Sequence, residues 1–130
     1  MANPNIVSVT SIFGESQGFN LSNTTTTSLM VVSAEKLVKV NRITVANVDG
    51  SAAADVTVSI VKAGFTSAAT GASIGTQTVF IASTISVPAD ASLVLLDTPI
   101  YLQEGDTLRG GASASGDLDL VVSYDVLNDA

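Results

Sequence analysis

The sequence predicts a single all-β domain, an antiparallel β-sandwich, on three observations. Its 130 residues fit one domain with its own core, and 46% are hydrophobic whereas only 13% are charged. β-Branched and other apolar residues recur with a period of two along several segments, as in strands that bury one face. Turn-forming clusters interrupt these segments at intervals of about 8 to 12 residues, and no helical pattern of useful length is present.

The N-terminal part of the chain lacks this strand pattern. Residues 14–27 end in four consecutive threonines, Thr24 to Thr27. We therefore expect residues 1–27 to form an irregular segment that makes contacts between subunits, and residues 28–130 to form the single β-sandwich domain. The first residues carry no positive charge and the next apolar stretch is interrupted by Ser and Thr, so we expect neither a signal peptide nor a membrane span.

The middle of the chain predicts two strands joined by a tight turn. Within Leu37–Val48 the apolar residues change phase, which indicates a β-bulge at Asn41-Arg42. The clearest strand is Ala54–Lys62, where apolar and polar side chains alternate. The intervening Asn47–Ser51 contains an Asp-Gly pair, which favours the positive φ of a tight turn. We therefore expect a hairpin there.

The stretch Ala63–Gln77 is rich in Gly, Ala, Ser and Thr and predicts a long loop. Loops of this length in a small domain are often functional or are ordered by a partner. The stretch also contains Phe65 and Ile74, apolar residues that have little reason to face water. We expect them to fold back onto the chain rather than contact a neighbour.

The C-terminal half predicts two further amphipathic strands and three turns. The expected inward-facing residues are Val79, Ile81, Ile85 and Val87 in one strand, and Leu118, Leu120, Val122, Tyr124 and Val126 in the other. Pro, Gly and Asp predict turns at Val87–Ala91, Gln103–Asp106 and Ala114–Asp117. Short strands of this kind fit an immunoglobulin-like sandwich or a jelly roll. We favour the immunoglobulin-like form, because eight equal strands are hard to place around two long loops.

The charge of the chain disfavours two classes of partner. The net charge is −7, from twelve acidic and five basic residues, so the summed field repels nucleic acids and anionic membranes. Lys36, Lys39 and Arg42 lie early, whereas most acidic residues lie later, and we expect the folded sheet to interleave them. The small polar residues that remain for the surface suit permanent contact with a neighbour, and they equally suit turns and outward strand positions.

The residue types needed for common catalytic chemistry are largely missing. The chain has no Cys and no His, which removes the thiol nucleophile, the commonest general base and the preferred transition-metal ligands. No motif links a serine to one of the lysines, as a Ser-Lys nucleophile requires. We therefore predict no catalytic, cofactor-binding or metal-binding residue, and no enzyme activity. No phosphate loop or dinucleotide motif is present either.

Two pairs of carboxylates are the remaining candidates for chemistry: Glu104 with Asp106, and Asp117 with Asp119. Separated carboxylates hydrolyse glycosides when a cleft holds the sugar. The chain has no Trp and few other aromatic residues to form such a cleft, so turn stabilisation explains the pairs more simply. The same acidic half raises calcium as a ligand, but the spacing does not match the twelve-position calcium loop.

Three stretches carry a family resemblance: Ile43–Val58, Ile81–Val94 and Pro99–Arg109. Together they resemble small β-sandwich virion structural proteins of tailed phages. The last stretch, with Gly116-Asp117-Leu118 and the closing strand through Tyr124, resembles the C-terminal half of small proteins from phages of marine cyanobacteria. The resemblance covers most of residues 36–127, and the family offers no catalytic residues to transfer.

The resemblance implies a many-copy virion protein, made in the host cytoplasm. Its most plausible place is that of a capsid decoration protein that braces neighbouring capsomers through non-covalent contacts. The implied partners are the major capsid protein or other virion proteins and further copies of the chain, with no nucleic acid and no membrane. The alternative is a neck or tail component, or an adhesin module that binds a host surface glycan through residues 63–77. A hydrolase using the four carboxylates is a distant third.

Overall fold

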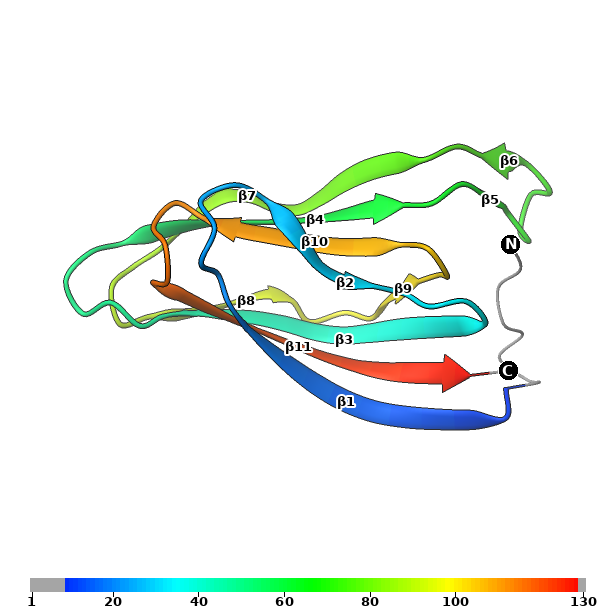
Figure 1. Ribbon diagram of the computed structural model, residues 1–130, viewed down its shortest axis with the longest axis horizontal. Coiled ribbons are helices and arrows are strands. Elements are labelled where there is room, and N and C mark those ends of the chain that lie inside the picture. Colours follow the sequence, from blue (N-terminus) through cyan, green and yellow to red (C-terminus); the bar gives the residue numbers. More distant parts are fainter. Residues whose placement is uncertain (1–8, 129–130) are drawn as a thin grey trace.

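Two antiparallel sheets packed face to face form the protein in the computed structural model, which describes residues 9–128 (Figure 1). The first sheet has the order β1 (Ser11–Asn20), β11 (Leu118–Asn128), β3 (Lys36–Asn47) and β8 (Ser92–Leu96), and β9 (Ile100–Leu102) also pairs with β3. The second has the order β2 (Thr27–Val31), β10 (Thr107–Ala112), β4 (Ala54–Lys62) and β7 (Gln77–Val87). A small hairpin, β5 (Phe65–Thr66) with β6 (Ser73–Ile74), lies between β4 and β7 in the sequence. The prediction of an antiparallel β-sandwich is therefore confirmed.

The strand order is that of a jelly roll. The strands pair from the outside of the sequence inward: β1 with β11, β2 with β10, β3 with β8 and β9, and β4 with β7. One long antiparallel ribbon, closed between β4 and β7, is thus wound into a five-stranded and a four-stranded sheet, as in jelly rolls. Our preference for the immunoglobulin-like form was wrong, because the N-terminal segment supplies a strand and residues 63–76 close the ribbon.

The division of the chain at residue 27 is also wrong for the described part of the N-terminal segment. Ser11–Asn20 is a ten-residue strand, paired in unbroken register with β11 from Ser11 opposite Asn128 to Asn20 opposite Asp119. Nearly all of β1 is exposed, so its sequence lacks the apolar alternation that predicts a strand. Backbone pairing with β11 holds the strand in place. Residues 1–8 of the predicted segment lie outside the described residues.

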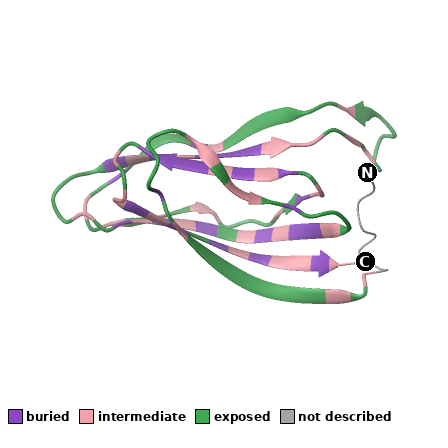
Figure 2. Cartoon of the chain, viewed as in Figure 1, coloured by how far each residue is buried: buried purple, intermediate pink, exposed green. Residues whose placement is uncertain are grey.

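The core lies between the two sheets, and the alternation of β4 and β11 is confirmed (Figure 2). Its largest fully buried apolar residues are Ile43, Leu102, Leu108, Leu118 and Leu120. The predicted inward face of β7 is partly wrong, because Val79 is 52% exposed and Ile85 is 42% exposed. Two register shifts against β4, one near Thr84 at φ 48°, change the phase of β7 along its length.

The predicted β-bulge in β3 is confirmed, but the predicted hairpin after it is not. Ser123 lies opposite Arg42 and Tyr124 lies opposite Val40, which leaves Asn41 as the extra residue. Asn47–Ser51 leads from β3 in one sheet to β4 in the other, and Gly50 is not among the glycines with positive φ. Side-chain hydrogen bonds shape this crossing instead, because buried Asn47 donates to the carbonyls of Ala52 and Val87, both at 3.0 Å.

The three predicted C-terminal turns are present, each at a junction between strands. Asp90 has φ 57°, Gly105 has φ 85° and Gly116 has φ 81°, so each turn uses a residue type that tolerates the left-handed region. Every one of these turns passes the chain from one sheet to the other. The turns therefore form the two ends of the sandwich.

Candidate assembly surfaces

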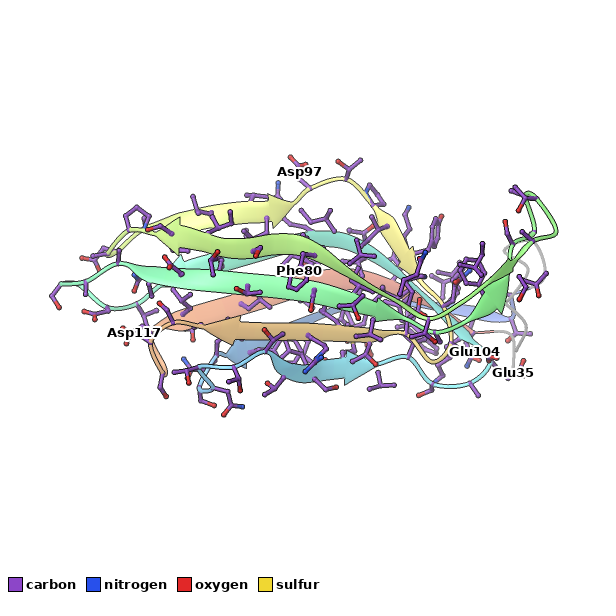
Figure 3. The ribbon with its side chains drawn as sticks, turned by 90° about the horizontal axis from the view of Figure 1, so that it is seen from above. Glu35, Phe80, Asp97, Glu104 and Asp117 are labelled. Atoms are coloured by element: carbon purple, nitrogen blue, oxygen red, sulfur yellow. The ribbon has the colours of Figure 1, made fainter. Side chains whose placement is uncertain are left out.

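The carboxylates considered for hydrolysis lie at opposite ends of the molecule. Glu104 and Asp106 lie in the turn that precedes β10, whereas Asp117 and Asp119 lie after its far end. Figure 3 shows Glu104 and Asp117 at the two ends of the sandwich. The two predicted pairs therefore do not face a common space in which a substrate could lie between them.

Asp106 is buried in an ion pair that ties two connections together. Its carboxylate accepts Lys62 Nζ at 2.5 Å and the backbone N–H groups of Ala63 and Gln103, both at 2.8 Å. The side chain of Asp106 is 1% exposed and that of Lys62 is 19% exposed. Lys62 Nζ also lies 5.6 Å from the ring centre of Phe65. This cluster holds the start of the β5–β6 hairpin against the turn before β10.

Glu104 and Asp119 also have local structural partners. Glu104 Oε2 accepts the backbone N–H of Glu35, a residue at φ 65°, at 2.8 Å. Asp119 Oδ1 accepts Asn20 Nδ2 at 2.7 Å, which links the ends of β1 and β11. These contacts account for both side chains without a ligand.

Asp49 and Asp117 form a carboxylate pair whose members influence each other's pKa. Hydrogen bonds from the backbone N–H and the hydroxyl of Ser51 lower the pKa of Asp49. Desolvation raises the pKa of Asp117, and the charge of Asp49 and a hydrogen bond with it raise that pKa further. Ionisation of Asp117 is therefore less favourable in the folded than in the unfolded chain.

We expect Asp117→Asn to raise the melting temperature at pH 7. An acid whose folded-state pKa is raised above its unfolded value destabilises the fold above the folded-state pKa, and this cost disappears below the unfolded value near 3.8. The gain should therefore shrink as the pH falls towards 3, as thermal unfolding by circular dichroism will measure. Asp97→Asn is the matched control, since it removes the same charge from an exposed site (Figure 3). An equal gain in both variants would attribute the effect to net charge alone.

The structure contains neither a metal cluster nor a spanning helix within residues 9–128. No group of three Asp or Glu side chains there is placed to hold a metal ion. No helix in that part of the chain is long and apolar enough to cross a membrane. Each sheet also ends in edge strands, and such strands can pair with another chain.

β1 is the first exposed edge. It ends the order of its sheet and is exposed at eight of its ten positions, so that it appears almost wholly solvent-facing in Figure 2. Its one charged residue is Glu15, whereas Ile12 is 62% exposed and Phe13 is 51% exposed. An edge strand with unpaired backbone groups and few charges is a template for pairing with another strand.

A cleft of about 400 Å³ lies beside this edge, between β1 and β2. Phe13, Glu15 and Gln17 line it from β1, and Tyr124 lines it from β11. The hydroxyl of Tyr124 donates to Gln17 Oε1 at 3.4 Å. Burial, and then the neighbouring Glu15, raise the pKa of Tyr124 above its usual value near 10. The cleft therefore lies directly beside the exposed edge of β1, on the side that faces the second sheet.

β7 is the second exposed edge, at the far side of the other sheet. Its eleven residues carry no charge, and Val79, Phe80 and Ile85 are each more than 40% exposed. Figure 3 shows Phe80 on this strand. The two register shifts against β4 interrupt the strand, and such bulges reduce the ability of an edge to pair with another chain. β1, which pairs with β11 without a shift, is therefore the more regular edge.

One residue of the early basic group has an acidic neighbour across the sheet. Lys39 in β3 lies directly opposite Asp125 in β11, whereas Lys36 and Arg42 lie opposite uncharged residues. Opposite charges at such a cross-strand position attract each other weakly.

The predicted loop at residues 63–77 is a projecting hairpin (Figure 1). Phe65 lies opposite Ile74 in the β5–β6 pair, so the two apolar residues are cross-strand neighbours, and the expectation that they avoid contact with a neighbouring subunit stays a prediction. Gly71 at φ 72° permits the turn between them. Phe65 is the only aromatic residue of the hairpin and already lies beside Lys62, so the hairpin offers no free aromatic platform for a sugar.

Comparisons with known proteins give distant structural matches only. No family model and no curated protein matches the sequence. A structure from Bacillus endospore appendages, described as disulfide-linked pili, matches 100% of this chain and 96% of its own, at 13% identity and a TM-score of 0.41. A pentameric capsid protein from metagenomic phage sequences matches 88% of this chain and 62% of its own, at 14% identity and a TM-score of 0.32. The VP2 subviral particle of infectious bursal disease virus matches 93% of this chain and 34% of its own, at 14% identity and a TM-score of 0.36.

Proposed function

We propose that this chain is a structural protein of a phage virion, a capsid decoration protein that braces neighbouring capsomers, and that it has no enzyme activity. The observation that carries the proposal is the exposed edge of β1 with its two apolar side chains and single charge. Such an edge is costly in a protein that works alone, because it promotes association. It is useful in a protein whose role is to be joined to neighbours, as in β-strand addition.

Two further observations support an assembly role. The four carboxylates considered for hydrolysis are divided between opposite ends of the molecule, and three of them have local partners. The resemblance of residues 43–58, 81–94 and 99–109 to small virion proteins of tailed phages supports the virion as the location, with the major capsid protein and further copies as partners. The marine cyanobacterial type of phage stays a prediction.

The test is to add the purified chain to phage particles that lack it. We expect saturable binding at symmetry-related capsid sites in electron micrographs, and a rise in the temperature at which the particles release DNA. Mass spectrometry of wild-type particles should find the chain in many copies. If particles contain none of the chain, the virion role is contradicted. If its density is confined to the neck or tail, the chain is a connector or adhesin and not a decoration protein.

A further inference from the structure

The free edge of β1 presents a defined set of backbone groups. Leu21, directly after β1, donates its N–H to the carbonyl of Leu118, and this bond continues the register of β1 with β11. Alternate residues of an antiparallel strand bond to the same neighbour. The odd-numbered residues of β1 therefore bond to β11, and the even-numbered residues direct their N–H and C=O groups outward. These are Ile12, Gly14, Ser16, Gly18 and Asn20.

The central part of this edge is nearly the same in both directions. Residues 13–19 read Phe-Gly-Glu-Ser-Gln-Gly-Phe, a palindrome about Ser16 apart from Glu in one half and its amide analogue Gln in the other. Two copies of β1 in antiparallel pairing about a two-fold axis at Ser16 place Phe beside Phe and Gly beside Gly. Each Glu15 then lies opposite Gln17 of the second copy.

Charge favours this register over its neighbours. A two-fold axis perpendicular to the sheet keeps the same face of both β1 strands on the same side of the joined sheet. Even-numbered residues then pair only with even-numbered residues, so in any alternative register the axis lies at another residue and not between two residues. An axis at Glu15 sets the two carboxylates directly opposite each other, which is destabilising. An axis at Gln17 sets Glu15 opposite Phe19 and leaves it without an amide. Only the axis at Ser16 gives every residue from 13 to 19 a partner of matching chemistry.

We infer that two copies of this chain associate through their β1 strands, antiparallel about a two-fold axis at Ser16. The five-stranded sheet of one copy and that of the other then become one continuous sheet, with the two β1 strands at its centre. Phe13, which is half exposed in the single chain, lies beside Phe19 of the second copy. This inference deepens the proposed assembly role by specifying the contact between copies, and it is independent of where on a particle the dimer binds.

Charge variants at one position test the register in solution. Gln17→Glu places Glu opposite Glu15 twice in the dimer, and we expect about a tenfold weaker association in sedimentation equilibrium. Gln17→Lys is the matched control, since it sets a cation opposite each Glu15 and should strengthen association by a similar factor. Gln17 is exposed, so both variants should fold. An equal effect of the two substitutions, or a chain that is monomeric at every concentration, would overturn the inference.

A single cysteine tests the axis, because the chain contains no other. Ser16→Cys places each thiol opposite its own counterpart, at a Cα separation of about 5.5 Å that a disulfide spans. Mild oxidation should therefore convert most of this variant to a covalent dimer on a non-reducing gel. Gly18→Cys is the control, because its two thiols lie four residues apart along the strands, about 13 Å, and should cross-link poorly.

The outcomes separate this inference from the virion role. Efficient cross-linking of Ser16→Cys with poor cross-linking of Gly18→Cys supports the dimer. An oligomer in which the two variants cross-link equally, or neither does, overturns the β1 contact but leaves the virion role intact. If the dimer cross-links but the chain is missing from particles, the virion role is contradicted and the β1 contact is still supported.

Discussion

Replacing Asp106 by alanine is expected to lower the free energy of unfolding by about 3 to 5 kcal/mol, measured by urea denaturation. The substitution leaves Lys62 without its counter-ion, and it leaves the N–H groups of Ala63 and Gln103 without their acceptor. Asp106 is fully buried, whereas Lys62 keeps some contact with water, which places the expected loss towards the lower end of this range.

Two companion variants separate the ion pair from the hydrogen bonds. Asp106→Asn keeps one acceptor for the backbone N–H groups but removes the charge, so we expect a smaller loss than for alanine. Lys62→Met keeps most of the packing of the lysine stem and leaves the carboxylate with its two backbone donors. A loss below about 1 kcal/mol in Asp106→Ala would contradict the structural role assigned to the cluster.

The inward faces of β4 and β11 could be predicted from sequence, whereas β1 was missed and the inward face of β7 was predicted only in part. β4 and β11 alternate because each packs one side against the core. β1 has no such pattern, because both of its faces are largely exposed. β7 has apolar residues in alternation, but two register shifts turn Val79 and Ile85 outward. Periodicity indicates burial, and it fails where a strand is exposed on both faces or changes phase along its length.

The turn-forming residues predicted where the chain reverses direction, but they did not predict how the strands are connected. The Asp-Gly pair at residues 49–50 correctly marks a reversal after β3. A hairpin and a crossing between sheets both begin with such a reversal, so the motif cannot tell which sheet receives the next strand. The jelly roll follows from pairings such as Ser11 with Asn128, which join the two ends of the sequence.

The regular strand at the candidate surface could not be predicted from sequence, and the contact itself stays a prediction. The N-terminal segment was expected to contact neighbours because it is irregular and almost uncharged, whereas residues 11–20 offer a regular strand edge. Whether an edge is free depends on the strand order, which composition does not contain. The ion pair of Asp106 likewise could not be predicted from sequence, because its partner Lys62 lies 44 residues away.

Replacing Leu120 by alanine is the second change with a large expected effect, a loss of about 2 to 5 kcal/mol in the free energy of unfolding. Leu120 lies in β11 between β1 and β3, is fully buried, and belongs to the core between the sheets. Truncation removes its contacts and leaves a cavity that the paired strands around it close only in part.

Val121→Ala is the matched control, because the next residue of the same strand points to the opposite face and is 42% exposed. Its loss should stay below about 1 kcal/mol, the range of strand propensity. If the two variants lose equal stability, Leu120 does not pack between the sheets and the register of β11 is wrong by one residue. A large difference instead supports that register, and the register of β1 with β11 is what directs the even-numbered residues of β1 to the free edge.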